Sequence, residues 1–522
     1  MTVLDLLITN AQVYDGLDNE PKFDHVGISG GRIAYLGEDA AVAAREIVDA
    51  DGRILCPGFI DSHGSNALGF FLPQASDHKL AQGVTTEIVG NDGFSVAPVG
   101  PRLAADLQQE ARGLGIDLTW RGFGQFAGAL EQHGLQQNVA CLVGHSTLRL
   151  GSLADWQRAE PVELEAMKTA LVQSLGEGAL GLSSGLADAP GAFAEAQEMS
   201  TLIQVAAAYG GVYAAHLRDE RQGLDDSIEE VIQAGQNGGL PVLLGHLKAA
   251  EKANWGRLAD VIRRIEEARV QGTRIAFAVY PYSTESSRLR TYLPKELMAE
   301  GTGGLAQRLG RSDWRHYALQ WLAYRGIDFE AMTLITNSLA GHDARGMSIA
   351  GIAQALGREP ADMLVDLVMN DADAWGVYRC LGEDDVEAAV LTNESIISSA
   401  SWPKPVNQPG NTDRPHPRNY GAFTRFLERY VISGLLSFGH AIRKITSQPA
   451  DLLGLSDLGR ISVGARADLV LLNPNDIRET ATYENPRQLA RGVDGVWVNG
   501  ARVFQDGQAT AARPGRVLRR GR

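Results

Sequence analysis

Three histidines and one aspartate stand where short β-forming apolar segments of the chain end: His63, Asp92, His216 and His246. Neutral imidazole and carboxylate groups are ligands that zinc takes in proteins, and a catalytic site leaves one coordination position open. A single histidine is more often a hydrogen-bonded structural residue. Three histidines and a carboxylate at equivalent places predict a metal centre, provided that the segments before them are neighbouring strands.

The spacing of these segments predicts how they are arranged. Apolar runs that end in a polar residue recur about every 30 to 50 residues, which is the length of one strand, loop and helix. Amphipathic helical patterns separate them, as at Leu258, Val261, Ile262 and Ile265. This alternation predicts an α/β fold, a (β/α)8 barrel of TIM type. Its eighth strand would end near Glu394, after an insertion at about residues 300–375. A doubly wound open sheet is the alternative, but no GxGxxG motif follows a strand.

Both ends of the chain are rich in short β segments. These segments occupy the first 54 residues and the part after Gly464, where Asn499-Gly500 is a typical hairpin turn. We therefore predict a small β-sandwich built from residues 1–55 and 460–522. Residues 56–459 would form the barrel domain.

Composition and charge limit the classes of partner that the chain can bind. The chain has 522 residues, of which 44% are hydrophobic and 21% charged, so it can bury a large core. Its net charge of −15 excludes general binding to nucleic acid or to an anionic membrane. Three unpaired cysteines, no leader pattern and no membrane-spanning segment predict a cytoplasmic protein. Whether the chain forms a homo-oligomer stays open.

Several motifs together resemble the amidohydrolase superfamily, and within it the N-acyl-D-amino-acid deacylase (D-aminoacylase) branch. The resemblance covers nearly the whole chain. It is carried by Pro57-Gly58-Phe59-Ile60-Asp61-Ser62-His63, Gly90-Asn91-Asp92-Gly93, Val143-Gly144-His145-Ser146, Tyr280-Pro281-Tyr282, Arg414-Pro415-His416-Pro417-Arg418 and Gly464-Ala465-Arg466-Ala467-Asp468.

The resemblance implies a metal-dependent barrel that hydrolyses an amide to a carboxylate and a free D-amino acid. Asp92, His216 and His246 match the tight zinc site of the family, with Asp92 in the place of a cysteine ligand. His63 matches the first histidine of the family's His-x-His motif. Ser65 stands where the second histidine is expected, which disfavours a second zinc site.

The resemblance also implies a proton-transferring aspartate in a Ser-Asp-Gly motif on the eighth strand. The matching stretch is taken as Thr392-Asn393-Glu394-Ser395, so Glu394 becomes the predicted acid–base residue. A shift of one residue would instead place Asn393 there, which cannot exchange protons. His145 is a second catalytic candidate that could polarise the carbonyl, and a structural hydrogen bond is its alternative. Arg218, Asp219 and Glu220 are expected to orient the metal ligands.

Three residues are predicted to bind the substrate. Arg418 matches the family arginine that holds the amino-acid carboxylate, which a guanidinium does with two parallel hydrogen bonds. Tyr280 and Ser286 match positions beside that carboxylate. The alternative for Arg418 is a surface ion pair.

The sequence therefore predicts a zinc-dependent hydrolase of linear amide bonds that acts on an N-acyl-D-amino acid or a related acylated amine. Two alternatives remain. The altered positions Ser65, Asp92 and Glu394 would suit a lyase, isomerase or acyl-transfer reaction in the same barrel, because a fold does not determine a function. A non-catalytic binding protein is the other.

Overall fold

Eight parallel strands form the centre of the molecule. The computed structural model describes residues 3–336, 339, 343–407 and 413–520. Consecutive strands of the central sheet lie side by side, and its two outer strands meet through a bridge between Gly64 and Ser401. The sheet is thus a nearly closed barrel, which confirms the predicted fold and excludes the open sheet. Its strands are β6 (Phe59–Asp61), β7 (Val84–Val89), β8 (Asn138–Gly144), β9 (Gly181–Gly185), β10 (Val212–His216), β11 (Val242–Leu244), β12 (Ile275–Val279) and β16 (Ser395–Ile397).

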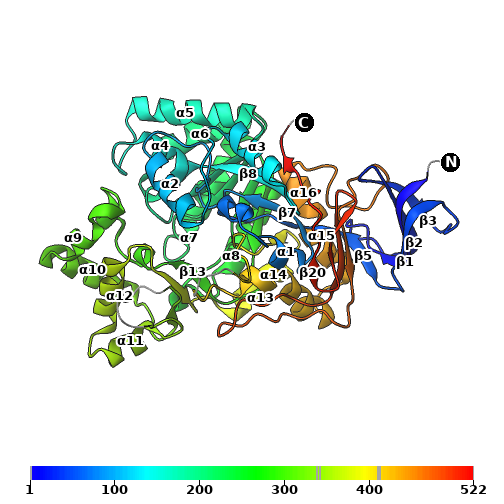
Figure 1. The fold of residues 1–522 in the computed structure, drawn as a ribbon. Helices are drawn as coiled ribbons and strands as arrows, with labels where there is room; N and C mark the ends of the chain where they lie inside the picture. Colours follow the sequence, from blue (N-terminus) through cyan, green and yellow to red (C-terminus); the bar gives the residue numbers. More distant parts are fainter. Residues whose placement is uncertain (1–2, 337–338, 340–342, 408–412, 521–522) are drawn as a thin grey trace.

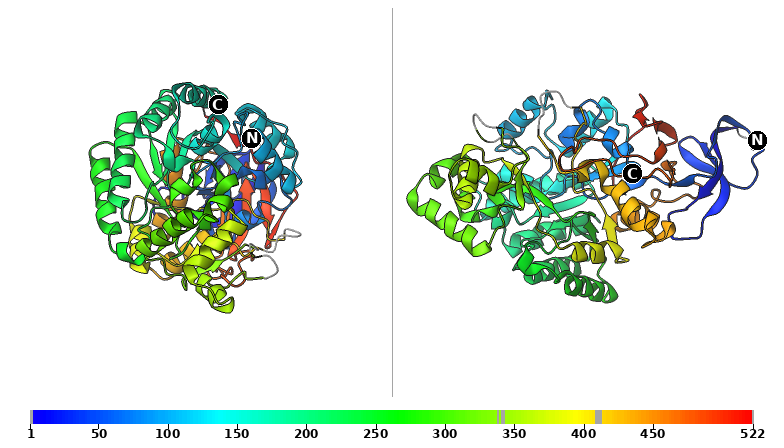
Figure 2. Two further views of the ribbon diagram at one scale, coloured as in Figure 1. Left: turned by 90° about the vertical axis from the view of Figure 1, so that its left-hand side faces the viewer. Right: turned by 90° about the horizontal axis from the view of Figure 1, so that it is seen from below.

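Helices surround the strands, as the end-on view shows (Figure 2, left). In α8 (Leu258–Val270), Leu258, Val261, Ile262 and Ile265 are buried on one face, as their spacing predicts. Within the described ranges we find no helix with the length and apolar character needed to span a bilayer. Other helices around the barrel are α1 (Asp77–Leu80), α2 (Ala104–Gly113), α3 (Phe123–His133), α4 (His145–Ser152), α5 (Pro161–Gly176), α6 (Ala196–Ala208), α7 (Leu224–Gly238), α14 (Arg418–Phe426), α15 (Phe438–Ile445) and α16 (Ser447–Leu453).

The eighth strand lies later in the chain than the sequence analysis placed it. The run before Glu394, which we took for a strand, belongs to helix α13 (Glu383–Leu391). Three acidic residues in the first turn of α13 favour the helix, because they face the positive end of its dipole. Strand β16 then begins at Ser395. Glu394 therefore lies at the amino end of the eighth strand and not at its carboxyl end.

A buried ionic cluster holds the first and last strands of the barrel together. The side chains of Lys79, Asp61 and Glu87 are fully buried between the strands and the helices. The Lys79 ammonium is paired with Asp61 and donates to the hydroxyls of Ser399 (2.6 Å) and Ser401 (3.0 Å) beyond β16. Burial alone would raise the pKa of Asp61, but Lys79 and Ser399 hold it below its usual value. The cluster thus ties β6, α1 and the end of β16 to one another.

The two chain ends form a nine-stranded mixed sheet at one end of the molecule (Figure 1). Both chain ends contribute strands to it, as predicted. The sheet is continuous because the long strand β1 pairs with β4 along its first half and with β5 along its second. The hairpin at Asn499-Gly500 is confirmed between β18 and β19. The strands are β1 (Leu4–Val13), β2 (Lys22–Ser29), β3 (Arg32–Gly37), β4 (Ala44–Asp49), β5 (Ile54–Pro57), β17 (Leu469–Leu472), β18 (Val493–Val498), β19 (Ala501–Gln505) and β20 (Gln508–Ala509).

The final strand departs from the predicted domain boundary. β21 (Val517–Leu518) leaves the terminal sheet and pairs in parallel with β8 of the barrel. The chain after β20 therefore belongs structurally to the barrel.

An insertion between the seventh and eighth strands projects at the opposite end of the molecule from the terminal sheet (Figure 2, right). It begins earlier than the predicted residues 300–375, because its first strand already pairs with its last in a three-stranded antiparallel sheet. Its elements are β13 (Glu285–Arg288), α9 (Leu305–Leu309), α10 (Ser312–Arg325), β14 (Met332–Leu334), α11 (Ile349–Ala355), α12 (Pro360–Asn370) and β15 (Trp375–Tyr378).

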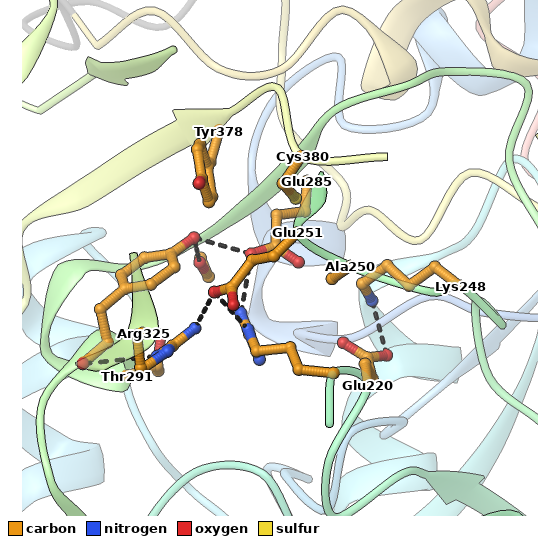
Figure 3. Close-up of polar contacts among 12 residues, drawn as sticks. Glu220, Lys248, Ala250, Glu251, Glu285, Thr291, Arg325, Tyr378 and Cys380 are labelled. Atoms are coloured by element: carbon orange, nitrogen blue, oxygen red, sulfur yellow. Dashed lines mark hydrogen bonds and ion pairs between the residues drawn. The ribbon is translucent and has the colours of Figure 1, made fainter. Parts of the chain in front are cut away.

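A second buried charge network fixes this insertion to the barrel (Figure 3). Glu251, in the loop after β11, accepts hydrogen bonds from Arg325 of α10 and from Arg221 after β10, the latter at 2.8 Å. Glu285 of β13 accepts from Arg221 (3.1 Å) and from the Tyr292 hydroxyl (2.7 Å). Two carboxylates and two guanidinium groups balance each other, so the insertion is held at a defined place beside the barrel mouth.

The Lys79 cluster gives a prediction for stability. Lys79→Met leaves Asp61 buried without its counter-charge, and losing one partner of a buried pair costs about 3–5 kcal/mol. We expect a clear fall in the urea midpoint of unfolding. Lys168→Met removes a lysine from the exposed ion pair with Glu165, and we expect a change within about 0.5 kcal/mol. Equal midpoints for the two variants would contradict the role of the cluster.

Candidate metal centre

One carboxylate oxygen lies at the centre of the predicted site. Oδ1 of Asp92 is 2.9 Å from Nε2 of His63, 3.3 Å from Nδ1 of His216 and 3.4 Å from Nε2 of His246. These residues come from the ends of the first, second, fifth and sixth strands, and the barrel brings all four together as the sequence predicted. His63 and His246 are buried, whereas the Asp92 side chain keeps 30% of its surface exposed. The cluster therefore opens to the barrel mouth through Asp92.

The backbone at Asp92 has a left-handed conformation that turns its side chain out of the strand direction. Its φ is +56°, a region that aspartate tolerates better than most residues. The surrounding loop is fixed by hydrogen bonds, since the Asn91 amide group donates to the carbonyls of Gly64 and Ile88, both at 2.9 Å. The Gly93 amide donates to the Ser183 hydroxyl at 3.2 Å. The position of Asp92 is thus set by the strands on either side of it.

A second carboxylate contacts the same histidines from the other side. Oε1 of Glu220 is 3.5 Å from Nε2 of His216 and 3.2 Å from Nδ1 of His246, the ring nitrogens that face away from Asp92. Lys248 donates to Glu220 at 2.6 Å (Figure 3), and its ammonium is 2.9 Å from His246 Nδ1. Groups of this kind fix the orientation of metal-binding imidazoles. Of the three residues expected to orient the ligands, Glu220 does so directly.

The charges in this cluster favour a cation. Burial would raise the pKa of Asp92, but His63, His216 and His246 hold it well below its usual value. Burial would lower the pKa of His216, but Glu220 and Asp92 outweigh that effect and raise it to about 9. The carboxylates of Asp92 and buried Glu220 therefore stabilise positive charge at His216, and a metal ion that displaces this proton would meet the same attraction.

The donor set also fits zinc by spacing. Zinc bonds of about 2.0–2.1 Å in a tetrahedral arrangement separate neighbouring ligand atoms by roughly 3.3 Å. The distances from Asp92 Oδ1 to His216 and His246 are 3.3 and 3.4 Å. These two separations therefore match a tetrahedral zinc site. Among the described residues, two groups of three place their ligand atoms within 4.8 Å of one another, namely His63, Asp92 and His246, and His216, Glu220 and His246. His63 lies at hydrogen-bond distance from Asp92, and its assignment as a ligand stays a prediction.

Glu394 does not join this cluster. It precedes β16 at the amino end of the barrel and forms an ion pair with Arg269 of α8 at 2.7 Å. The prediction that Glu394 transfers protons is corrected on this ground, because the metal cluster occupies the carboxyl ends of the strands. Asn393 precedes the same strand and lies at the same end. The residues that leave the eighth strand toward the mouth are Ser398, Ser399, Ala400 and Ser401.

His145 is fully buried at the start of α4, and its contacts lead into the helical layer. Its Nε2 lies 2.6 Å from Glu198 of α6, and Arg149 also binds Glu198. The structural hydrogen bond, which we kept as the alternative for His145, is therefore present. Arg218 similarly binds Glu230, and Asp219 binds the backbone of Gly223 at the start of α7.

Arg418 and Tyr280 lie together next to the metal cluster. The Arg418 guanidinium is 4.6 Å from the centre of the Tyr280 ring, and that ring is 6.3 Å from the ring of His246. Nε of Arg418 donates to the carbonyl of Ala400 at 3.1 Å. Arg418 is 8% exposed and pairs with no carboxylate among the described residues. The surface ion pair that we considered for Arg418 is therefore absent there. Ser286 lies in β13, shortly after Tyr280 in the sequence, and its side chain is half-buried.

The sequence reasoning missed Ala400. Its methyl side chain has no reactive group, and only the location of β16 shows that Ala400 follows the eighth strand, where its carbonyl binds Arg418.

Comparisons with known proteins find relatives that match nearly the whole chain. Residues 46–504 match the model of the amidohydrolase family. The chain is 34% identical over 520 residues to the N-acyl-D-glutamate deacylase of Alcaligenes xylosoxydans xylosoxydans, covering 99% of this chain and 97% of that protein. It is 31% identical to the D-aminoacylase of the same organism, covering 99% and 98%. A crystal structure of N-acyl-D-glutamate deacylase from Bordetella bronchiseptica, complexed with zinc and a phosphonate inhibitor, superposes with a TM-score of 0.83 at 32% identity, covering 99% of this chain and all of that one.

Metal binding should depend on pH through His216. A pKa of about 9 means that His216 carries a proton at pH 7, whereas a metal requires the neutral ring. We expect the apparent affinity for zinc to rise about tenfold per pH unit from pH 7 to 9 and then to level off. Titration of the metal-free protein against a competing chelator measures this.

Matched variants test the same site. His216→Asn should lose tight zinc binding, measured as metal content after dialysis, whereas exposed His133→Asn should retain it. An affinity that does not change between pH 7 and 9, or tight zinc in His216→Asn, would contradict the assignment.

Proposed function

Because the chain belongs to the amidohydrolase family, we propose that it is a metal-dependent hydrolase that removes the acyl group from an N-acyl-D-amino acid or a related acylated compound. Three features support this proposal: a donor set suited to one zinc ion, a buried guanidinium beside it, and relatives that are N-acyl-D-amino-acid deacylases. The D-configuration of the proposed substrate is inferred from the names of relatives.

Asp92, His216 and His246 would hold the metal, and Glu220 would orient the two histidines. A divalent metal at this place supplies polarisation of the acyl carbonyl and activation of a water molecule. One tight site is proposed. Ser65 and Ala400, in the segments that follow the first and eighth strands, bring neither an imidazole nor a carboxylate for a second.

The observation that carries the proposal is the buried Arg418, which pairs with no carboxylate in the part of the chain that the structure describes. A charged group without a counter-ion in a low-dielectric environment is costly, so its position indicates that an anion completes it. Nε is already bonded to Ala400, which leaves the two terminal nitrogens for a carboxylate. Tyr280 packs between Arg418 and His246, so a substrate held by its carboxylate would present a neighbouring acyl group to the metal cluster.

One observation favours a non-hydrolytic reaction as the second candidate. The eighth strand is followed by Ser398, Ser399, Ala400 and Ser401, and Glu394 is at the other end of the barrel, so this segment provides no proton-transferring carboxylate at the mouth. Metal-dependent binding of N-acyl-D-amino acids without release of an amine would support that candidate.

Activity measurements test the proposal through Arg418. Arg418→Lys keeps the charge but loses the paired hydrogen bonds, so we expect KM for N-acetyl-D-amino acids to rise about 10- to 100-fold with metal content unchanged. Ninhydrin detection of the released amine, with N-acetyl-L-amino acids in parallel, measures this.

Two controls accompany that variant. Arg429→Lys alters an arginine in the π-helical segment after α14, 3.8 Å from Glu383, and it should leave KM unchanged. Glu394→Gln should also leave turnover within about twofold, because its carboxylate serves only an ion pair at the amino end of the barrel. If Arg418→Lys left KM unchanged, or if Glu394→Gln abolished turnover, the proposed site would be wrong.

A further inference from the structure

Ala400 lies just beyond the eighth strand, at the carboxyl end of the barrel. The hydroxyls of its neighbours Ser399 and Ser401 both bind Lys79, in the buried cluster behind the strands. The carbonyl of Ser401 accepts from the Ser65 amide at 3.0 Å, which places this segment beside the end of the first strand. The carbonyl of Ala400 accepts from Arg418. Ala400 therefore lies at the mouth, between Arg418 and the segment that follows His63.

The backbone at Ala400 suits a different kind of residue. Its φ is +46°, in the left-handed region where asparagine, aspartate and glycine are favoured over alanine. Asp92 and His246, the other non-glycine residues that turn left-handed beside the cluster, have φ of +56° and +30° and both carry functional side chains. Ala400 instead contributes its carbonyl, which holds Arg418. This strand end thus orients a binding residue but brings no acid to the mouth.

Without an acid at this strand end, cleavage of an amide bond is impaired more than cleavage of an ester bond. When an amide C–N bond breaks, the leaving nitrogen must receive a proton, and a positioned acid contributes about 10²- to 10⁴-fold to that step. The leaving oxygen of an ester departs as a much weaker base and does not require this proton. The carboxylates that contact the histidines are Asp92 and Glu220. Asp92 is surrounded by three imidazoles and Glu220 is bound to Lys248.

We propose that Ala400 makes this site selective for oxygen-linked acyl groups, so that the substrates are O-acyl-D-2-hydroxy acids and comparable esters. The inference rests on the proposed function, because it uses the same metal cluster and the same Arg418 carboxylate site. In the reaction, water forms a bond to the acyl carbon and the ester C–O bond breaks. The products are a carboxylate, a D-2-hydroxy acid and one proton that passes to solvent.

A matched substrate pair tests the selectivity. O-acetyl-D-mandelate and N-acetyl-D-phenylglycine differ only in the linking atom, oxygen or NH. For the wild-type chain loaded with zinc, we expect the ester-to-amide ratio of kcat/KM to exceed by at least about 100-fold the ratio for hydroxide-catalysed hydrolysis without protein. A ratio equal to or below that reference would overturn the inference.

Two variants of similar shape isolate the carboxylate. Ala400→Asp and Ala400→Asn both suit the left-handed backbone, but only the first carries an acid. We expect amide kcat/KM to be about 100-fold or more higher in Ala400→Asp than in Ala400→Asn, and ester kcat/KM to differ less than tenfold. Metal content and thermal melting of each variant confirm that both are folded and loaded. Equal amide rates in the two variants would overturn the inference.

The outcomes also separate this inference from the proposed function. Amide cleavage by the wild type at the reference ratio would leave the hydrolase proposal standing and remove the role of Ala400. If the metal-loaded wild type and Ala400→Asp cleave neither substrate, the hydrolase proposal itself is overturned, and the inference with it.

Discussion

The structure of the site depends on one carboxylate oxygen with three imidazoles around it. Oδ1 of Asp92 lies within 3.4 Å of nitrogens from His63, His216 and His246, and these residues come from four strands. These contacts form only if the four strands end at the same level along the barrel axis. The closure of the barrel and the register of its strands therefore determine the geometry of the site. The buried Lys79 cluster is part of the same constraint, because it joins the first strand to the segment that follows the last.

Electrostatics on both sides of the histidines complement each other. Asp92 contacts one ring nitrogen of His216 and one of His246, and Glu220 contacts the other nitrogen of each ring. Lys248 balances Glu220, and Glu251, only three residues later, joins the network that fixes the insertion. Buried charges in the segment after β11 thus link two features of the site. They orient the rings of His216 and His246, and they hold the insertion beside the barrel mouth.

The sequence predicted most of the fold and of the metal site because both leave local signals. Apolar runs with polar ends recur at regular intervals, and histidine and aspartate have few alternative uses when they occur together at such ends. The eighth strand left a weaker signal. Only three residues long, it follows a helix whose apolar residues we took for a strand, and Glu394 was therefore assigned to the wrong end. Ala400 could not be found from its chemistry, since its importance comes from its backbone and its neighbours.

The terminal sheet has a consequence for how the chain reaches its final structure. Strand β5 lies at the beginning of the chain, yet its partner β17 is more than 400 residues later, with the whole barrel domain between them. During synthesis β1 to β5 emerge before that partner, and β5 must wait for it while the barrel segments are made. The edge of β5 that later binds β17 is exposed to other chains over this interval. The yield of folded protein therefore depends on protection of this edge during synthesis as well as on the stability of the finished barrel.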